Sequence, residues 1–428
     1  MAKNSKKTIY LCENCGNEFS QWSGRCTICG EWNSLKEVSF DVPITNARSS
    51  KIEATNIKDV KVSSKTRTTT GISEFDRVLG GGIVAGSIIL LGGEPGIGKS
   101  TLMLEVAQTI GHTIYISAEE SLEQIKIRAD RLNLKSKDLT LISDGNIDSL
   151  EMTVQQYKPQ LLIVDSVQTV YLSSYPSTPG SLVQVRECGI FLQRLAKKSG
   201  VPIIIVGHVT KEGSVAGPRM LEHLVDAVLY LEGERFHDAR ILRGVKNRFG
   251  ATNEVGIFQM ESKGLIEVKN PSELFLSQRI DKPGSATGCT LEGTRPLLIE
   301  VQSIVVSTNY GYPKRTSSGF DLNRLNLLAA VVSKNTPINL SNFDIYLNIA
   351  GGIKISEPAI DLPVCLSMIS SYKNKTVSRK DCFFAEVGLL GEIRKVSREA
   401  DRVKECQRLG YNPKYHYKDL NQLIQTLF

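Results

Sequence analysis

The chain has 428 residues, a hydrophobic content of 41%, a charged content of 23% and a formal net charge of +7. This length predicts two to four domains at about 100–200 residues each, and the composition is that of an ordinary soluble globular protein. The sequence contains neither an apolar run near the ~20 residues of a membrane span nor the apolar core of a secretory signal. We therefore expect a cytoplasmic protein without membrane segments, whose positive charge permits a polyanionic partner.

Two Cys-x2-Cys-Gly turns stand close together at the N-terminus. Each turn directs two thiolates to one point, and together they predict a closed tetrahedral sulfur site that suits Zn²⁺. About 30 residues cannot build a core, so bound metal would supply the folding energy. A redox pair and a disulfide knot are the alternatives, which a reducing cytoplasm disfavours. The predicted zinc ligands are Cys12, Cys15, Cys26 and Cys29.

Two tryptophans, Trp22 and Trp32, lie in the same stretch and are the only ones in the chain. They stack on a base or a partner, or they pack over the small zinc lobe, and the sequence favours neither. Residues 37–65 are polar without a sustained period, which predicts a linker or an extended segment. Residues 70–82 then predict a short helix that ends at three glycines.

The stretch IILLGGEPGIGKST joins an apolar strand, a glycine-rich turn and a helix. This is the GxxxxGK[ST] spacing in the strand–loop–helix context that it requires, which disfavours a turn that merely connects two elements. Glycines let main-chain N–H groups converge on phosphates, and the start of the helix adds positive potential. The predicted ATP-binding residues are Gly93, Glu94, Pro95, Gly96, Ile97, Gly98, Lys99, Ser100 and Thr101.

Within this loop, Lys99 is expected to reach the β- and γ-phosphates of ATP and Ser100 to hold Mg²⁺. A short strand over residues 113–117 is followed by two glutamates. A carboxylate in that position can polarise the water that attacks the γ-phosphate. Glu119 is the predicted catalytic residue and Glu120 the second choice, while a solvated glutamate in a first helical turn is the alternative.

Leu161–Asp165 is an apolar strand typical of the centre of a parallel sheet, and Asp165 is expected to complete the Mg²⁺ shell. Residues 170–182 either line the path of a DNA strand or form an ordinary connection. After the next apolar strand, His208 either senses the γ-phosphate or has only a structural role.

Three more strand patterns follow, and Lys246–Gly250 (KNRFG) lies between the last two. Lys246 and Arg248 are predicted to contact a phosphate bound by a neighbouring subunit, which would make hydrolysis depend on assembly. A basic β-turn that ends in glycine is the alternative.

The order of the cysteine turns, GGEPGIGKST, ISAEES, LLIVDS and KNRFG resembles the bacterial RadA (Sms) family of RecA-like recombination proteins over essentially the whole chain. The resemblance implies a hexameric ring on single-stranded DNA, DNA-dependent ATP hydrolysis, partnership with the RecA recombinase, and branch migration on branched DNA. It assigns nucleotide contacts to Lys99 and Ser100, and the Walker B and catalytic positions to Asp165 and Glu119. Arg248 is similar to the finger of DnaB-type helicases.

The last third of the chain, from about residue 272, resembles the proteolytic domain of Lon. The turn Glu357–Ala359 lacks the nucleophilic serine of that domain, and the lysine position falls at Arg394, which cannot act as a base. Ser356 and Lys395 lie nearby. We expect a proteolytically inactive scaffold for ring assembly and DNA contact, in which basic clusters either neutralise phosphates or only aid solubility.

The predicted fold class is α/β, with a RecA-like P-loop parallel sheet between a zinc knuckle and an α+β Lon-like domain. The expected limits are 1–36 for the zinc module, 37–65 for the linker, 66–271 for the ATPase and 272–428 for the Lon-like domain. The predicted function is a DNA-dependent ATPase motor of recombinational repair that uses ATP, Mg²⁺ and Zn²⁺. A Lon-type protease and a nucleotide-switched binding protein are the rival hypotheses.

Overall fold

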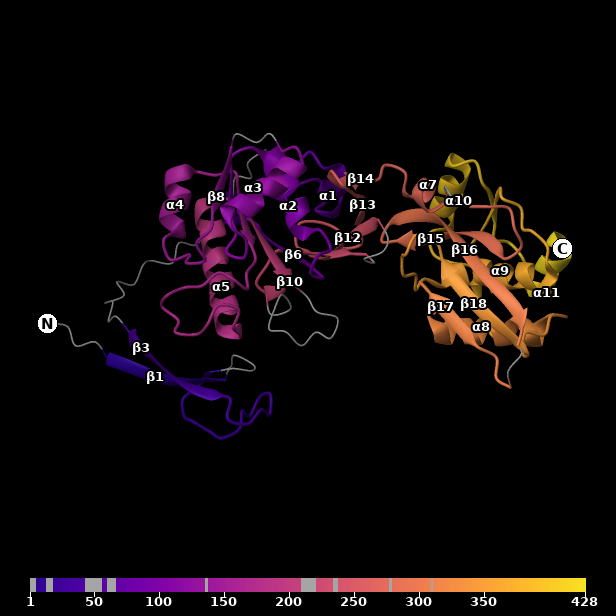
Figure 1. The fold of residues 1–428 in the computed structure, drawn as a ribbon, viewed down its shortest axis with the longest axis horizontal. Coiled ribbons are helices and arrows are strands. Elements are labelled where there is room, and N and C mark those ends of the chain that lie inside the picture. Colours follow the sequence, from indigo (N-terminus) through magenta and orange to yellow (C-terminus); the bar gives the residue numbers. More distant parts are fainter. Residues whose placement is uncertain are drawn as a thin grey trace. The chain divides into compact units, whose positions relative to one another are not determined.

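The computed structural model describes residues 5–12, 18–42, 56–59, 67–134, 138–208, 221–233, 238–276, 279–308 and 311–428. The chain divides into two compact units, coloured along the sequence in Figure 1. The first is Met1–Glu232, Leu242–Thr252 and Ser262–Leu265, and the second is Gly233–Ile241, Asn253–Glu261 and Ile266–Phe428. The domain limits expected from the sequence stay predictions. No helix among the described residues is both long and apolar enough to cross a membrane.

The N-terminal lobe of the first unit is a three-stranded sheet with the order β2-β1-β3. Strand β1 is antiparallel to both neighbours, and Cys12 at its end pairs with Leu35. Among the described residues, the buried hydrophobic core of this lobe consists of Cys12, Cys26 and Leu35, a size at which bound metal would be expected to supply stability. The strands are β1 (Ser5–Cys12), β2 (Glu18–Phe19) and β3 (Leu35–Val42), so β3 runs into the stretch expected to be a linker or an extended segment.

A nine-stranded sheet with the order β14-β13-β12-β11-β6-β10-β9-β7-β8 contains the strand that leads into the glycine-rich loop. The five pairs from β11 to β8 are all parallel, which confirms the predicted P-loop parallel sheet. The strands are β6 (Ile88–Gly93), β7 (Thr113–Ile116), β8 (Leu139–Ile142), β9 (Leu161–Asp165), β10 (Ile203–His208), β11 (Ala227–Glu232), β12 (Ala239–Asn247), β13 (Val255–Glu261) and β14 (Gly264–Glu267).

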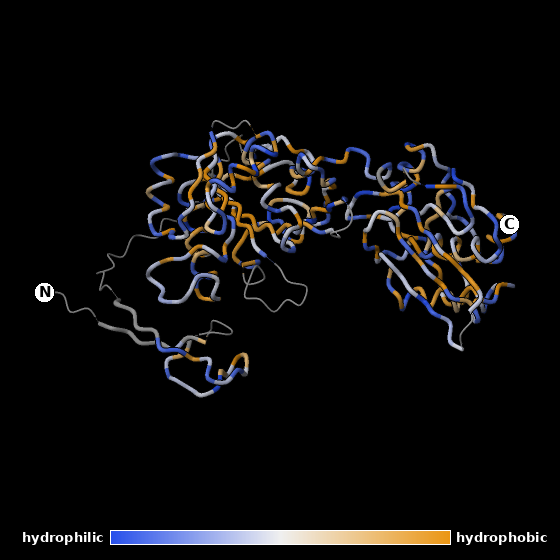
Figure 2. The backbone as a smooth tube through the Cα atoms, in the orientation of Figure 1, coloured by the Kyte–Doolittle hydropathy of each residue, from blue (hydrophilic) through white to orange (hydrophobic). Residues whose placement is uncertain are grey.

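Helices cover this sheet because its central strands are apolar on both faces. Every residue of β6 is buried, and hydrophobic residues follow the central strands in Figure 2. Ile88 and Leu90 pack in one cluster with residues of α5, while the alternate residues of β6 point to the opposite face. The remaining elements of this part are η1 (Ile57–Asp59), β4 (Arg67–Thr68), α1 (Ser73–Val78), β5 (Ile83–Val84), α2 (Lys99–Ile110), α3 (Leu122–Arg131), α4 (Leu150–Tyr157) and α5 (Leu182–Ser199).

The second unit is built on a six-stranded sheet with the order β17-β18-β16-β15-β19-β22. Helix α9 is its central helix, because residues 361–370 are all buried. The mixed order of helices and strands agrees with the α+β expectation, while kinship to Lon stays a prediction. The elements are α7 (Pro271–Leu276), β15 (Ser285–Glu292), β16 (Arg295–Ser307), β17 (Arg315–Ser318), α8 (Leu322–Asn335), β18 (Phe343–Ile349), η2 (Pro358–Ile360), α9 (Asp361–Lys373), β19 (Asp381–Phe383), β20 (Glu386–Val387), β21 (Ile393–Arg394), α10 (Glu399–Arg408), β22 (Asn412–Lys414) and α11 (Leu420–Leu427).

The carboxylate of Glu105, on α2, is buried against β14. One of its oxygens accepts a hydrogen bond of 2.9 Å from the Leu265 N–H, and the other has no partner among the described residues. Burial raises the pKa of Glu105 to about 7, although the Leu265 hydrogen bond lowers it. Because the pKa in the folded state exceeds that in the unfolded state, the ionised carboxylate destabilises the fold. Its contribution to stability therefore falls as the pH rises from about 4.5 to about 7.

We predict that Glu105→Gln flattens this pH dependence and raises the melting temperature at about pH 8 by a few degrees. The neutral amide keeps an acceptor for Leu265 and carries no buried charge. Thermal unfolding between about pH 5 and about pH 8 measures the effect. The exposed Glu261→Gln serves as the matched control, and identical pH profiles for Glu105→Gln and the parent chain would contradict the prediction.

Candidate nucleotide-binding site

The glycine-rich loop lies between β6, which ends at Gly93, and α2, which begins at Lys99. A Cβ atom at Gly93 would lie 2.7 Å from the carbonyl oxygen of Leu231, so only glycine fits there. Gly98 precedes the helix with a φ of 116° and gives α2 no side-chain cap. The first N–H groups of the helix are therefore not bound by a capping side chain, and a phosphate is their natural partner.

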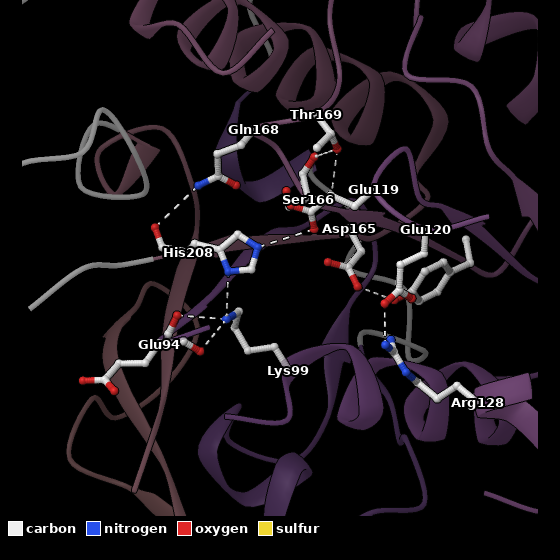
Figure 3. A network of polar contacts seen from close by, with 12 residues as sticks. Glu94, Lys99, Glu119, Glu120, Arg128, Asp165, Ser166, Gln168, Thr169 and His208 are labelled. Atoms are coloured by element: carbon white, nitrogen blue, oxygen red, sulfur yellow. Dashed lines mark hydrogen bonds and ion pairs between the residues drawn. The ribbon is translucent and has the colours of Figure 1, made fainter. Parts of the chain in front are cut away.

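Lys99 is buried at the carboxyl ends of the central strands (Figure 3). Its Nζ donates hydrogen bonds of 2.9 Å to the carbonyls of Gly93 and Glu94 and lies 3.3 Å from His208 Nδ1. Burial lowers the pKa of Lys99 to about 8, while the charges of Asp165 and Glu119 raise it. An anion that binds here would stabilise the charged form of the lysine.

Asp165 ends β9 and is buried beside Lys99 in the network of Figure 3. The hydroxyl of Tyr115, on β7, donates a hydrogen bond of 2.5 Å to Asp165 Oδ2 and so fixes the orientation of the carboxylate. Burial raises the pKa of Tyr115, which keeps the hydroxyl protonated and able to donate. The sequence analysis missed Tyr115, whose only signal is its position on a strand next to the one that ends in Asp165.

The two candidate glutamates differ in their partners. Glu119 Oε2 lies 3.5 Å from His208 Nε2, and His208 in turn contacts Lys99 through its other ring nitrogen. Glu120 instead forms an ion pair with Arg128 on α3. Glu119 is thus connected through His208 to Lys99 of the glycine-rich loop, whereas Glu120 contacts Arg128 instead.

Lys246 and Arg248 lie near the amino ends of the parallel strands, whereas Lys99 lies near their carboxyl ends. The Arg248 N–H donates to the Asp226 carbonyl at 2.9 Å, and the Asp226 N–H donates to the carbonyl of Ile88, the first residue of β6, at 2.8 Å. Lys99 follows the other end of β6, and six strand residues span about 17 Å. The structure therefore does not bring these two cations to the nucleotide site of their own chain.

The two cations of this motif also differ in their surroundings. Lys246 Nζ donates to the carbonyls of Glu222 (2.6 Å) and Val225 (2.9 Å), and burial lowers its pKa. The side chain of Arg248 is 51% exposed and lies 3.4 Å from the Asp226 carboxylate. Arg248 is thus the more accessible cation of the two.

Three of the four predicted zinc ligands converge in the N-terminal lobe. The sulfur atoms of Cys12, Cys26 and Cys29 all lie within 4.8 Å of one another, and those of Cys12 and Cys29 are 3.6 Å apart. A tetrahedral site with Zn–S bonds of about 2.3 Å needs sulfur atoms about 3.8 Å apart, so these thiols fit Zn²⁺. Cys15 lies outside the described residues.

The tryptophans of this lobe do not form its core, because Trp22 is 58% exposed and Trp32 is 67% exposed. The guanidinium of Arg25 lies over the ring of Trp32, at 5.6 Å from its centroid. These exposures favour the interpretation that the tryptophans stack on a base or a partner over the one that they pack over the zinc lobe.

Comparisons with known proteins agree with this geometry. A family model described as an AAA domain matches residues 53–214, and one described as a rubredoxin metal-binding domain matches residues 10–37. The chain is 48% identical to the DNA repair protein RadA of Bacillus subtilis, over 96% of this chain and 92% of that protein. The chain belongs to the RadA family of DNA repair proteins. RadA of Streptococcus pyogenes serotype M6 is likewise 48% identical, over 99% of this chain and 95% of its own length.

Membership of the RadA family agrees with the two binding sites that the residues form. The AAA match covers Lys99 and Asp165, and the metal-binding match covers all four cysteines predicted to bind zinc. A RadB recombinase structure has 20% sequence identity and a TM-score of 0.38 over 47% of this chain, a likeness too low to add to the family assignment.

We predict that ATP binding takes up a proton through Lys99. Near pH 8 the lysine of the free protein is about half protonated, and a bound triphosphate raises its pKa, so binding takes up about half a proton per site. Calorimetry of a non-hydrolysable ATP analogue in buffers of different ionisation enthalpy measures this uptake. Lys99→Arg, which stays charged, should show none. Equal uptake in both proteins would refute the assignment to Lys99.

We predict one Zn²⁺ per chain in protein purified under reducing conditions, because three thiols already stand at the required spacing. Cys26→Ser should lose the metal and unfold the lobe, whereas Cys188→Ala, in the core of the ATPase fold, should retain it. Elemental analysis measures the zinc content of each protein, and a parent protein without metal would exclude the zinc site.

Proposed function

We propose that this chain is a DNA-dependent ATPase of recombinational repair. The observation that carries the proposal is the convergence of Lys99, Asp165, Glu119 and His208 at the carboxyl edge of a parallel sheet, next to a helix start with no side-chain cap. Nucleotides bind at this edge in open α/β folds. Membership of a family of DNA repair proteins supports DNA as the polymer on which the ATPase acts.

Residues 93–101 would bind the phosphates of ATP. The Ser100 hydroxyl and the Asp165 carboxylate would supply oxygen donors of the kind that Mg²⁺ prefers, and the ion would neutralise charge on the phosphates. Glu119, whose side chain is 46% exposed and lies beside His208, would accept a proton from the attacking water. Lys99 would stabilise the negative charge that develops during transfer.

Lys246 and Arg248 would act on a nucleotide held by a neighbouring subunit. Their distance from Lys99 of the same chain supports a role in trans, and such a role requires an assembly in which the nucleotide site borders another copy. A closed ring gives this arrangement to every site. The ring is hexameric in this proposal. It would bind single-stranded and branched DNA in the cytoplasm and promote branch migration together with the RecA recombinase.

The C-terminal unit would serve as a scaffold for assembly and DNA contact rather than as a protease. Glu357, in the turn where Lon carries its serine, is ion-paired with the buried Arg402 and accepts hydrogen bonds from Thr290 (2.9 Å) and Leu291 (2.6 Å). Arg394 is exposed and pairs with Glu392. These contacts support a structural role for the turn and leave no general base at position 394.

We predict that Arg248→Ala spares ATP binding and ring formation but lowers DNA-stimulated ATP turnover by about 10³-fold or more, the usual contribution of an arginine finger. Phosphate release with and without single-stranded DNA measures this loss, and Arg243→Ala, on the strand that leads into this turn, is the matched control. Unchanged stimulated hydrolysis in Arg248→Ala would contradict the trans role. A parent protein that hydrolyses ATP at the same rate without DNA would contradict the proposed function.

A further inference from the structure

We propose that Gln168 is a positioning residue that couples the state of the nucleotide to the loop of residues 170–182. Gln168 lies in the turn after β9, close to Asp165 in sequence, and borders His208 in Figure 3. The inference rests on the proposed function, because it assumes that ATP is hydrolysed at this site.

The amide oxygen of Gln168 lacks a hydrogen-bond partner among the described residues. Its Oε1 atom is buried and accepts no hydrogen bond from the described residues, and the buried hydroxyl of Ser166 has none either. Buried polar atoms are nearly always hydrogen-bonded, so two such atoms next to Asp165 indicate a position where a polar group binds. The water that attacks the γ-phosphate can donate to Gln168 Oε1, and the Ser166 hydroxyl can donate to a phosphate oxygen.

The other end of the same amide contacts the tip of β10. Gln168 Nε2 donates a long hydrogen bond of 3.5 Å to the carbonyl oxygen of His208. The ring of His208 contacts Lys99 and Glu119 on its two nitrogens. Gln168 is therefore connected to the site through the main chain of His208, and its unpartnered Oε1 could add a second connection through the attacking water.

The main chain of Gln168 forms the base of the 170–182 loop. The loop leaves β9 just after Gln168 and returns to it at Gly180, where an added Cβ atom would lie 3.1 Å from the Gln168 carbonyl oxygen. A displacement of Gln168 would thus move both ends of the loop.

The loop is also tied together internally. The buried side chain of Gln184 accepts from the Leu172 N–H (3.0 Å) and donates to the carbonyls of Leu172 (3.1 Å), Tyr175 (2.8 Å) and Ser177 (3.1 Å). Because these bonds hold the loop together, a shift at its base displaces the loop as a body rather than being absorbed within it.

The experiment compares Gln168→Leu with the parent chain, because leucine keeps the volume and removes both polar ends. We expect the KM for ATP to stay within about twofold, while the ratio of kcat with single-stranded DNA to kcat without it falls about tenfold or to near unity. The affinity for an oligothymidylate should also lose its dependence on whether a non-hydrolysable ATP analogue or ADP is bound. Gln156→Leu, on the exposed face of α4, is the matched control and should behave as the parent.

A merely structural role for Gln168 would not separate kcat from KM or erase the nucleotide dependence of DNA affinity. If Gln168→Leu shows the same DNA stimulation as the parent, the inference is wrong and the proposed function stands. If the parent itself is not stimulated, both fail. If Gln168→Leu does not fold, Gln168→Glu replaces it, because glutamate keeps an acceptor and loses the donor to His208. The ratio of kcat with single-stranded DNA to kcat without it should then fall in Gln168→Glu, and an unchanged ratio would contradict the inference.

Discussion

The buried ammonium group of Lys99 is the interaction on which the rest of the site depends. It is hydrogen-bonded to main-chain carbonyls of its own loop, and burial has lowered its pKa to about 8. Carbonyl dipoles compensate a buried cation only in part, whereas a phosphate supplies full negative charge and short charge-assisted hydrogen bonds. The loop therefore reaches its best electrostatic state only with an anion at the start of α2.

The functional groups lie at the two opposite ends of the parallel strands. The groups suited to phosphate chemistry lie at the carboxyl ends, and KNRFG lies at the amino ends. Asp226 connects KNRFG to the phosphate-binding strand: its Oδ2 accepts the Ile88 N–H at 3.1 Å, and its Oδ1 faces Arg248. Arg67 adds a hydrogen bond of 2.6 Å to the Phe249 carbonyl, so the turn that carries Arg248 is held by two separate elements.

The parts of the molecule that local patterns determine were predictable from the sequence. The strand, glycine loop and helix around Lys99 follow from residue spacing alone, and so do the apolar strand that ends in Asp165 and the turn from Cys26 to Cys29. Tyr115, Asp226 and Gln168 were not predictable, because their roles depend on which strands lie side by side. The choice of Glu119 over Glu120 likewise depends on the positions of His208 and Arg128, which no spacing rule supplies.

In the proposed assembly, one subunit completes the nucleotide site of the next. To test this arrangement, Lys99→Ala subunits are mixed with Arg248→Ala subunits, each expected to be inactive alone, and DNA-stimulated phosphate release is measured. The account predicts recovery to about a quarter of the parent rate in an equal mixture, since about a quarter of the interfaces then pair an intact Lys99 with an intact Arg248. A mixture that never exceeds the sum of its two components, at any ratio, would contradict it.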